Sequence, residues 1–284
     1  MKIKITADST ADLSKELCEK YNITQLPLCI TLGENIYTDG VNITPDMIYH
    51  HVSSTKQMPK TSAINSEQYK NFFNSVLAEG YDAIIHFNIS SEMSVTHNNA
   101  KLAAEDFNNV FVVDSKTLST GTGLQAMYAS ELASQEKFSA EEIYNKVIAR
   151  IDDVQSSFIL DKLDYLYRGG RCSAVSMFGA NLLKIKPSIE VKNGKMGVGK
   201  KYMGKYDKCV LKYVQDILNT YKNPDYTRIF VTHTKVDPEL VNTVIDYLKQ
   251  NSKFKEIIKT TAGCTITSHC GPNTLGILFY SNKK

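Results

Sequence analysis

Residues 82–114 read DAIIHFNISSEMSVTHNNAKLAAEDFNNVFVVD, and this stretch decides the fold. Residues 82–89 and 110–114 are short apolar runs of the length that buried strands have, and residues 95–107 between them are predicted to be helical. Parallel strands need a long crossover connection, which is usually a helix. The stretch therefore predicts two strands of a parallel sheet and the helix that joins them.

The same alternation of strands and helices extends from this unit in both directions. Residues 3–6 and 25–32 are predicted strands, and the turn-rich residues 33–40 follow the second of them. Further helices are predicted at residues 13–21, 45–53, 66–79, 118–134 and 139–152. Their expected N-caps include Thr44, Asn65 or Ser66, and Ser139, because these side chains can accept hydrogen bonds from the first amides of a helix. The pattern predicts an α/β domain over residues 1–155, with helices on both faces of a parallel sheet.

Four polar loops are expected along one edge of this sheet. Right-handed crossovers place the loops that leave the carboxyl ends of parallel strands on the same side. The loops in question share a high content of hydroxyl side chains: residues 8–10, 61–65, 90–96 and 114–120. Hydroxyls and free amides can hold a carboxylate or a phosphate. The alternative is that they only cap helices and solvate the loops.

The second half of the chain has a different pattern of predicted strands and helices. Residues 185–191 are a predicted strand that turns through Asn193-Gly194 into a hairpin, because Asn-Gly favours the tight turn of a two-residue loop. Helices are predicted at residues 206–221 and 238–249, and strands at residues 228–233, 256–260 and 275–281. These elements predict a second, α+β domain over residues 156–284. A ligand is expected between the two domains, since clefts between domains are common ligand sites.

Composition excludes several classes of function. The 33 basic and 30 acidic residues are interleaved, so a nucleic-acid partner is not expected. No stretch reaches the roughly 20 apolar residues of a membrane span and no signal peptide is visible, so we expect a cytoplasmic protein without stable membrane insertion. Six cysteines without a C-x-x-C pair indicate reduced thiols, and six histidines without an H-E-x-x-H pair predict no metal site.

Two short segments carry the most distinctive chemistry. Residues 163–171, LDYLYRGGR, place Arg168 and Arg171 on either side of two glycines, where a guanidinium could reach a carboxylate or phosphate. A glycine C-cap with arginines on the surface is an equally good interpretation. His269 is expected in a tight loop before the last strand, and a lone histidine is more often structural than catalytic. The sequence of residues 194–201 nearly matches the P-loop motif, but Lys201 stands where a Ser or Thr hydroxyl is required, so no P-loop is predicted.

The order and spacing of several motifs resemble the DegV family of bacterial fatty-acid-binding proteins over essentially the whole chain. The shared motifs are residues 8–13 (DSTADL), 61–62 (TS), 89–96 (ISSEMSVT), 113–115 (VDS), 163–171 and 185–187 (IKP), together with His269 and Gly271. The resemblance implies a fatty acid bound between an N-terminal α/β domain and a C-terminal α+β domain. It also implies a carrier rather than an enzyme, with no catalytic residue and no cofactor.

The resemblance further implies which residues bind the ligand. Thr61, Ser62 and Ser94 would hydrogen-bond the carboxylate of a long-chain acid such as palmitate, stearate or oleate, and Thr96 belongs to the same set. Arg171 and His269 would supply charge or further donors from the second domain. Some family members serve as the acyl-binding subunit of a fatty-acid kinase, so a kinase is a possible partner.

The chain departs from the family pattern in three places, and two other functions stay open. Residues 63–65 (AIN) replace a common Gln-Pro-Ser, Val95 replaces a common glycine, and residues 202–204 lack the arginine of many kinase-associated members. One alternative is a phosphotransferase or hydrolase that uses Ser94, Arg171 and His269. The other is a sensor of a small polar anion. We expect a monomer.

Overall fold

The first lobe of the molecule is built on a four-stranded parallel sheet. The computed structural model describes residues 1–172 and 185–282. The strands of the first sheet lie in the order β2-β1-β6-β7, and every neighbouring pair is parallel: β1 Ile3–Asp8, β2 Ile23–Leu26, β6 Ala83–Asn88 and β7 Val110–Asp114. The predicted parallel α/β sheet is confirmed, and residues 82–114 supply two of its strands.

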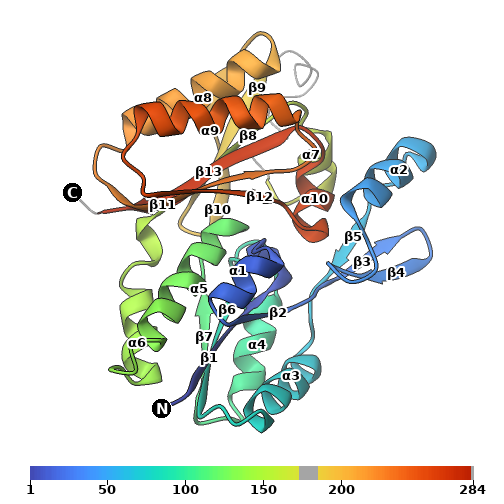
Figure 1. Cartoon of the computed structure of the whole chain (residues 1–284). Helices are drawn as coiled ribbons and strands as arrows, with labels where there is room; N and C mark the ends of the chain where they lie inside the picture. The colour runs from blue at the N-terminus through green and yellow to red at the C-terminus, as the bar shows by residue number, and fades with distance from the viewer. Residues whose placement is uncertain (173–184, 283–284) are drawn as a thin grey trace.

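Helices cover both faces of this sheet, as the alternation of strands and helices predicts (Figure 1). The helices are α3 Ser66–Ala78 and α4 Thr96–Ala104 on one face, and α5 Thr120–Ala133 and α6 Ala140–Ile148 on the other. Successive side chains of a strand point to opposite faces. Ile84 accordingly packs with Phe73 of α3, whereas Ile85 packs with Met127 of α5.

The expected helix caps are present where the sequence places them. The Asn65 side chain accepts a hydrogen bond from the Gln68 amide at 2.9 Å, and the Gln68 side chain accepts one from the Asn65 amide at 3.0 Å. Ser139 and Glu142 form the same reciprocal pair at the start of α6. Such pairs satisfy amides that have no partner inside the helix. These local signals therefore fix the beginnings of both helices.

The second lobe is built on a six-stranded mixed sheet in the order β10-β9-β8-β13-β11-β12. Its strands are β8 Val154–Leu160, β9 Lys186–Lys192, β10 Lys195–Tyr202, β11 Pro224–His233, β12 Glu256–Thr261 and β13 Thr274–Ser281. Among the described strand pairs of this sheet, only β11–β12 is parallel. Helices α8 Tyr206–Thr220 and α9 Pro238–Asn251 cover the outer face. The β9–β10 hairpin turns at Asn193-Gly194 as predicted, with φ of 51° and 81°.

Helix α5 joins the two lobes. It packs on β1 and β6 of the first sheet and on β8 and β13 of the second, so none of its residues is exposed. Gly123 permits this close packing, because a Cβ atom there would lie 2.9 Å from the carbonyl oxygen of Ala11 and 2.8 Å from Leu13. The hydroxyls of Thr120 and Thr232 lie 2.6 Å apart across the junction. The lobes therefore share one continuous packed interior.

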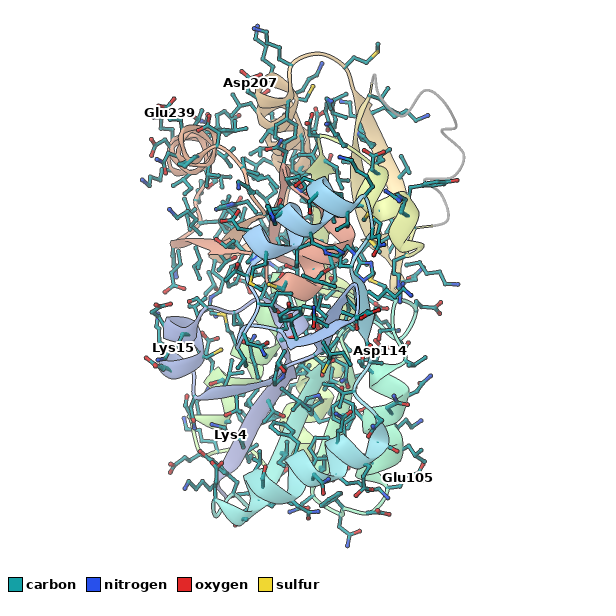
Figure 2. The ribbon with its side chains drawn as sticks, turned by 90° about the vertical axis from the view of Figure 1, so that its right-hand side faces the viewer. Lys4, Lys15, Glu105, Asp114, Asp207 and Glu239 are labelled. Carbon is teal, nitrogen blue, oxygen red and sulfur yellow. The ribbon has the colours of Figure 1, made fainter. Side chains whose placement is uncertain are left out.

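An arm of the first lobe, residues 29–62, reaches across to the second lobe. It contains a three-stranded antiparallel sheet in the order β4-β3-β5 (β3 Cys29–Leu32, β4 Asn35–Thr38, β5 Lys60–Ser62) and helix α2 Pro45–Thr55. Figure 2 shows α2 lying across the face of the molecule between the lobes, above the level of Asp114. Three expectations are wrong here. The strand at residues 25–32 is two strands in different sheets, residues 33–40 include β4, and Thr61 and Ser62 lie on β5 rather than at the edge of the parallel sheet.

Proline explains the first of these corrections. Pro27 has no backbone N–H and cannot donate to a ladder, so it stands between the end of β2 and the start of β3. The next amide, that of Leu28, donates to the Ser9 hydroxyl at 3.2 Å instead of to a strand. The chain thus leaves the parallel sheet at Pro27 and enters the arm.

The remaining elements are short. They are η1 Ser9–Ala11, α1 Lys15–Lys20, η2 Ile151–Asp153, α7 Asp164–Gly169 and α10 Cys264–Cys270. Helix α10 corrects the expectation of a tight loop around His269, which lies in the last turn of this helix. Its N-cap, Gly263, has no side chain, so the sequence carries no local start signal.

Candidate functional site

A cavity of about 460 Å³ lies where the two lobes and the arm meet. The first lobe and the arm line it with Thr10, Leu28, Thr61, Ser62, Ala63, Ile89, Ser91, Glu92, Met93, Ser94, Val95 and Leu118. The second lobe lines it with Leu166, Arg171, Met196, Thr265, Ile266, His269 and Cys270. Segments from both ends of the chain therefore share one hollow.

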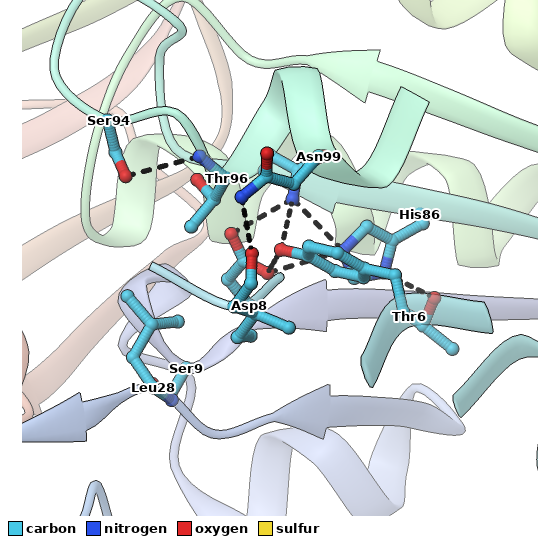
Figure 3. Close-up of polar contacts among 11 residues, drawn as sticks. Thr6, Asp8, Ser9, Leu28, His86, Ser94, Thr96 and Asn99 are labelled. Atoms are coloured by element: carbon cyan, nitrogen blue, oxygen red, sulfur yellow. Dashed lines mark hydrogen bonds and ion pairs between the residues drawn. The ribbon is translucent and has the colours of Figure 1, made fainter. Parts of the chain in front are cut away.

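The cavity brings together five of the six residues that the family resemblance implies. Thr61, Ser62, Ser94, Arg171 and His269 all line it. Thr96 does not belong to the lining. It is fully buried in the first turn of α4, and its backbone amide donates to the Ser94 hydroxyl at 3.3 Å (Figure 3). Thr96 thus contacts Ser94, and its role toward a ligand stays a prediction.

Thr61 and His269 form one of the direct contacts between the arm and the second lobe. The Thr61 hydroxyl lies 2.8 Å from Nε2 of His269. The other ring nitrogen, Nδ1, is buried and has no partner among the described residues. Gly169 leaves room for this ring, because a Cβ atom at residue 169 would lie 2.7 Å from Nδ1. One nitrogen of the imidazole is thus held and the other is uncommitted.

Burial and the neighbouring Arg171 lower the pKa of His269 to about 4. Both effects disfavour the charged form, since burial removes water from the ring and the arginine repels a second positive charge. The imidazole is therefore neutral near pH 7. A neutral ring carries one N–H, so His269 can donate a single hydrogen bond while Arg171 supplies the positive charge.

Arg171 is held at the end of α7. The helix ends at Gly169 and is capped by Gly170, which has a φ of 69° that favours glycine. The guanidinium of Arg171 then turns back to donate to the Gly169 carbonyl at 2.8 Å. The side chain is exposed, and its planar group has five N–H donors in total. The two glycines of the RGGR motif thus provide both a C-cap for α7 and space for His269.

Ser94 sits in a loop that several hydrogen bonds fix. The loop follows β6, and its backbone turns at Ser90, whose carbonyl accepts from the Ser94 amide at 3.2 Å. The Ser90 hydroxyl donates to the Gly194 carbonyl of the second lobe at 2.8 Å, and the Ser91 hydroxyl donates to Asp114 at 2.5 Å. The loop is therefore tied both to the next strand and to the β9–β10 hairpin.

Apolar side chains make the other wall of the cavity. Ile89, Met93, Leu118, Leu166 and Ile266 belong to one buried cluster, and Met196 packs against it. We name the polar lining residues of the arm, the Ser94 loop, the end of α7 and α10 the polar end of the cavity: Thr61, Ser62, Ser94, Arg171 and His269. The cavity thus combines these polar groups with an apolar wall. This arrangement suits a molecule with an anionic head and a hydrocarbon body.

One buried polar cluster was not predicted from the sequence. Asp8, labelled in Figure 3, is fully buried at the end of β1. It accepts hydrogen bonds from the Tyr69 hydroxyl at 2.7 Å and the Asn88 amide at 3.0 Å. His86 lies 3.3 Å from the same carboxylate and 2.8 Å from the Thr6 hydroxyl. Burial, and then Asp8, raise the pKa of Tyr69 well above its usual value, so its hydroxyl stays protonated and donates. The sequence signal for this cluster is Asp8 at the end of an apolar strand.

Two further carboxylates hold α10 in place. Asp39 of the arm accepts hydrogen bonds from the Cys264 amide at 2.9 Å and from the Thr265 amide and hydroxyl at 3.1 and 2.6 Å. Asp12 accepts from the Gly263 amide at 2.8 Å, and burial raises its pKa to about 8. Carboxyl oxygens at the start of a helix satisfy its free amides, whether or not the group is ionised. The arm thus grips α10 at its first residues through Asp39 and near its end through Thr61.

Neither a metal cluster nor a membrane helix is found in the part of the chain that the structure describes. Across residues 1–172 and 185–282, no three His, Cys, Asp or Glu side chains lie close enough to hold a metal ion. The helices of the same residues are all too short or too polar to cross a bilayer.

A model of the DegV family, described as "Uncharacterised protein, DegV family", matches residues 2–282. The chain belongs to the DegV family. Among DegV relatives, a DegV domain-containing protein of Clostridium acetobutylicum is 33% identical over 98% of each chain. A fatty acid-binding protein of Thermotoga maritima is 30% identical over 97% of this chain and 96% of that protein.

Solved structures of DegV proteins share this fold over the whole chain. A DegV family protein from Thermus thermophilus, described by its fatty acid binding, has a TM-score of 0.89 at 28% identity and covers 99% of this chain and 100% of its own. A stearic acid-binding protein from Eubacterium ventriosum has a TM-score of 0.83 at 28% identity over 98% of each chain. The two-lobed α/β architecture is therefore the DegV fold.

Proposed function

We propose that this DegV-family chain binds one long-chain fatty acid in the cavity between its lobes and acts as a carrier. The carboxylate is held by Thr61, Ser62, Ser94, Arg171 and His269, and the acyl chain lies along the apolar wall. The observation that carries this proposal is the cavity itself, which joins hydroxyl, guanidinium and imidazole groups from both lobes to a hydrocarbon-like surface. The fatty acids bound by relatives of this fold support the same ligand class.

Simple energetics support a lipid ligand. Burying an acyl chain yields about 0.8 kcal/mol per CH2, so a chain of roughly 16 carbons gains on the order of 10 kcal/mol before entropic costs. A buried carboxylate is costly unless it is hydrogen-bonded. Arg171 offers positive charge, and Nδ1 of His269 is a donor in the tautomer in which Nε2 accepts the hydrogen bond of the Thr61 hydroxyl. The hydroxyls of Ser62 and Ser94 offer further donors.

We further propose that the bound acid is presented to a partner that acts on its carboxylate, such as a fatty-acid kinase. Arg171 and Ser62 are exposed, so the polar end of the cavity lies near solvent. An acid group at this end would be reachable from outside, whereas its acyl chain would stay covered. The carrier itself would perform no chemistry.

Titration of the delipidated protein with palmitate and with its methyl ester tests the proposal. The acid is expected to bind one to one and at least about 10-fold more tightly than the ester. The reason is that the ester carries no negative charge and cannot form an ion pair with Arg171. Equal affinity for the two would contradict a carboxylate site. Hydrolysis of the ester by wild-type protein, lost in His269→Ala, would point to an enzyme instead. Saturable displacement of palmitate by phosphate would point to a sensor of polar anions.

A further inference from the structure

A second, smaller cavity lies directly behind the first. Its volume is about 30 Å³, and it shares three lining residues with the main cavity: Leu118, Ile266 and Cys270. Ile266 and Cys270 are four residues apart on α10, so they lie on the same face of that helix. These three side chains, which we name the partition, are all buried and separate the two hollows.

The second cavity has no contact with the polar end of the main cavity. None of Thr61, Ser62, Ser94, Arg171 and His269 lines it. Its other walls come from the inner face of the second sheet and from the segments that flank α10: Ser119, Ser156, Phe158, residues 232–234, Ala262, Thr274, Gly276 and Leu278. It therefore adjoins the main cavity at the partition, and none of the groups proposed to hold the head group lines it.

Most hydroxyls around the second cavity are already paired elsewhere. The Ser119 hydroxyl donates to Asp12, and that of Thr274 donates to the Cys270 carbonyl at 3.1 Å. The Thr234 hydroxyl accepts from the Thr274 amide at 3.0 Å. Only the hydroxyl of Ser156 lacks a partner among the described residues that line this cavity. Apart from the Ser156 hydroxyl, the walls therefore offer no unpaired hydroxyl to a water molecule, and a largely apolar hollow favours hydrocarbon over water.

We propose that the second cavity receives the last carbons of the acyl chain, and that the partition sets the longest chain that binds without loss. This inference rests on the proposed function. A chain that runs from the polar end along the apolar wall of Ile89, Met93 and Leu166 reaches the partition before the second cavity. A short acid stops before it, and a longer one passes between the three side chains. The terminal carbons of a longer chain then gain buried area only until the second cavity is full.

Ala262 offers a way to fill the second cavity from behind. Its side chain is buried, it lines the second cavity, and it takes no part in the main one. Ala262→Leu adds three carbons there. Each methylene buried contributes about a fourfold gain in affinity, so loss of room for two carbons lowers affinity about 15-fold for acids long enough to need them. Acids that stop at the partition are unaffected.

The test is a series of dissociation constants for saturated acids of 12 to 20 carbons with delipidated wild type, Ala262→Leu and Leu118→Ala. In wild type, affinity rises with length and then levels off. In Ala262→Leu, it levels off about two carbons earlier, with the 12-carbon acid bound within about twofold of wild type. In Leu118→Ala, which removes part of the partition, it levels off about two carbons later. Leu248 of α9 is buried in the core of the second lobe and lines neither cavity. Leu248→Ala is therefore the control for loss of packing alone, and we expect it to keep the wild-type profile.

The outcomes separate the two proposals. The same levelling length in all variants that bind would overturn the role of the second cavity and leave the carrier function standing. No binding of any acid by wild type would overturn the carrier function itself. If Ala262→Leu fails to fold, Ala262→Val adds two carbons at the same position and gives the same direction of change. An unchanged profile for Ala262→Val and Leu118→Ala together would overturn the inference.

Discussion

Replacing Arg171 by alanine is expected to weaken palmitate binding by about 10- to 100-fold. A hydrogen bond to a charged group contributes about 1.5–3 kcal/mol, and Arg171 is the cation that lines the described polar end of the cavity. His269 cannot replace it, because burial, the larger cause of the lowered pKa of that ring, persists in the variant and still disfavours the charged imidazole. The measurement is a titration of delipidated wild type and variant with palmitate at pH 7.

Arg168→Ala is the matched control for this experiment. Arg168 lies three residues earlier in the same motif, and its guanidinium donates to the Lys56 carbonyl at 3.1 Å without lining the cavity. We expect affinity within about twofold of wild type for this variant. Arg171→Lys should fall between the two, since lysine keeps the charge but lacks the planar fork. Equal loss of affinity in Arg168→Ala and Arg171→Ala would contradict a specific role for Arg171.

Replacing Asp8 by alanine is expected to lower the free energy of unfolding by about 3–5 kcal/mol. The change removes the acceptor for the Tyr69 hydroxyl and the Asn88 amide, and it leaves His86 buried beside the gap. Removing one member of a buried polar or charged group strands its partners without water to replace it. The measurement is urea unfolding at pH 7, followed by circular dichroism.

An exposed aspartate gives the control for the Asp8 experiment. Asp106 pairs with Lys70 at 2.6 Å on the surface, and Asp106→Ala should lower stability by less than about 1 kcal/mol. Asp8→Asn keeps the shape and one acceptor, so an intermediate loss is expected. A loss below about 1 kcal/mol in Asp8→Ala would contradict the structural role of the cluster.

The parts of the fold that the sequence predicts are those with local signals. Residues 82–114 contain two apolar runs and the helix between them, and the structure pairs those strands in parallel. Asn65 and Ser139 predict the starts of their helices, because each cap and its partner lie three residues apart in the sequence. Asn193-Gly194 specifies its own turn. In each case the interaction that fixes the element lies within a few residues.

The parts that the sequence did not predict depend on distant contacts. Helix α10 has only seven residues, and the acceptor for its first amides is Asp39, which lies 225 residues away from Cys264. Strand β5 has three residues and is a strand because it pairs with β3. Strand β8, Val154–Leu160, lies between β9 and β13 and was also missed. Short elements of this kind gain their stability from tertiary packing and not from propensity.

The candidate site has the same character. Thr61 and His269 lie 208 positions apart, and their 2.8 Å contact exists only because the arm crosses to the second lobe. Spacing and composition could flag hydroxyl loops and the RGGR motif, but they could not join them. The family resemblance supplied that link. The hydrogen bonds from the start of α10 to Asp12 and Asp39 were not predicted, although Asp12 belongs to the DSTADL motif that carries part of the resemblance.

Organic extraction of the protein purified from bacterial cells, followed by mass spectrometry, tests the central claim most directly. A carrier with a greasy cavity closed by polar groups should retain about one long-chain fatty acid per protein chain through purification. Arg171→Ala, purified in the same way, should retain clearly less, and Arg168→Ala as much as wild type. Wild-type protein that carries no fatty acid, and that takes up none when palmitate is added back, would contradict the account.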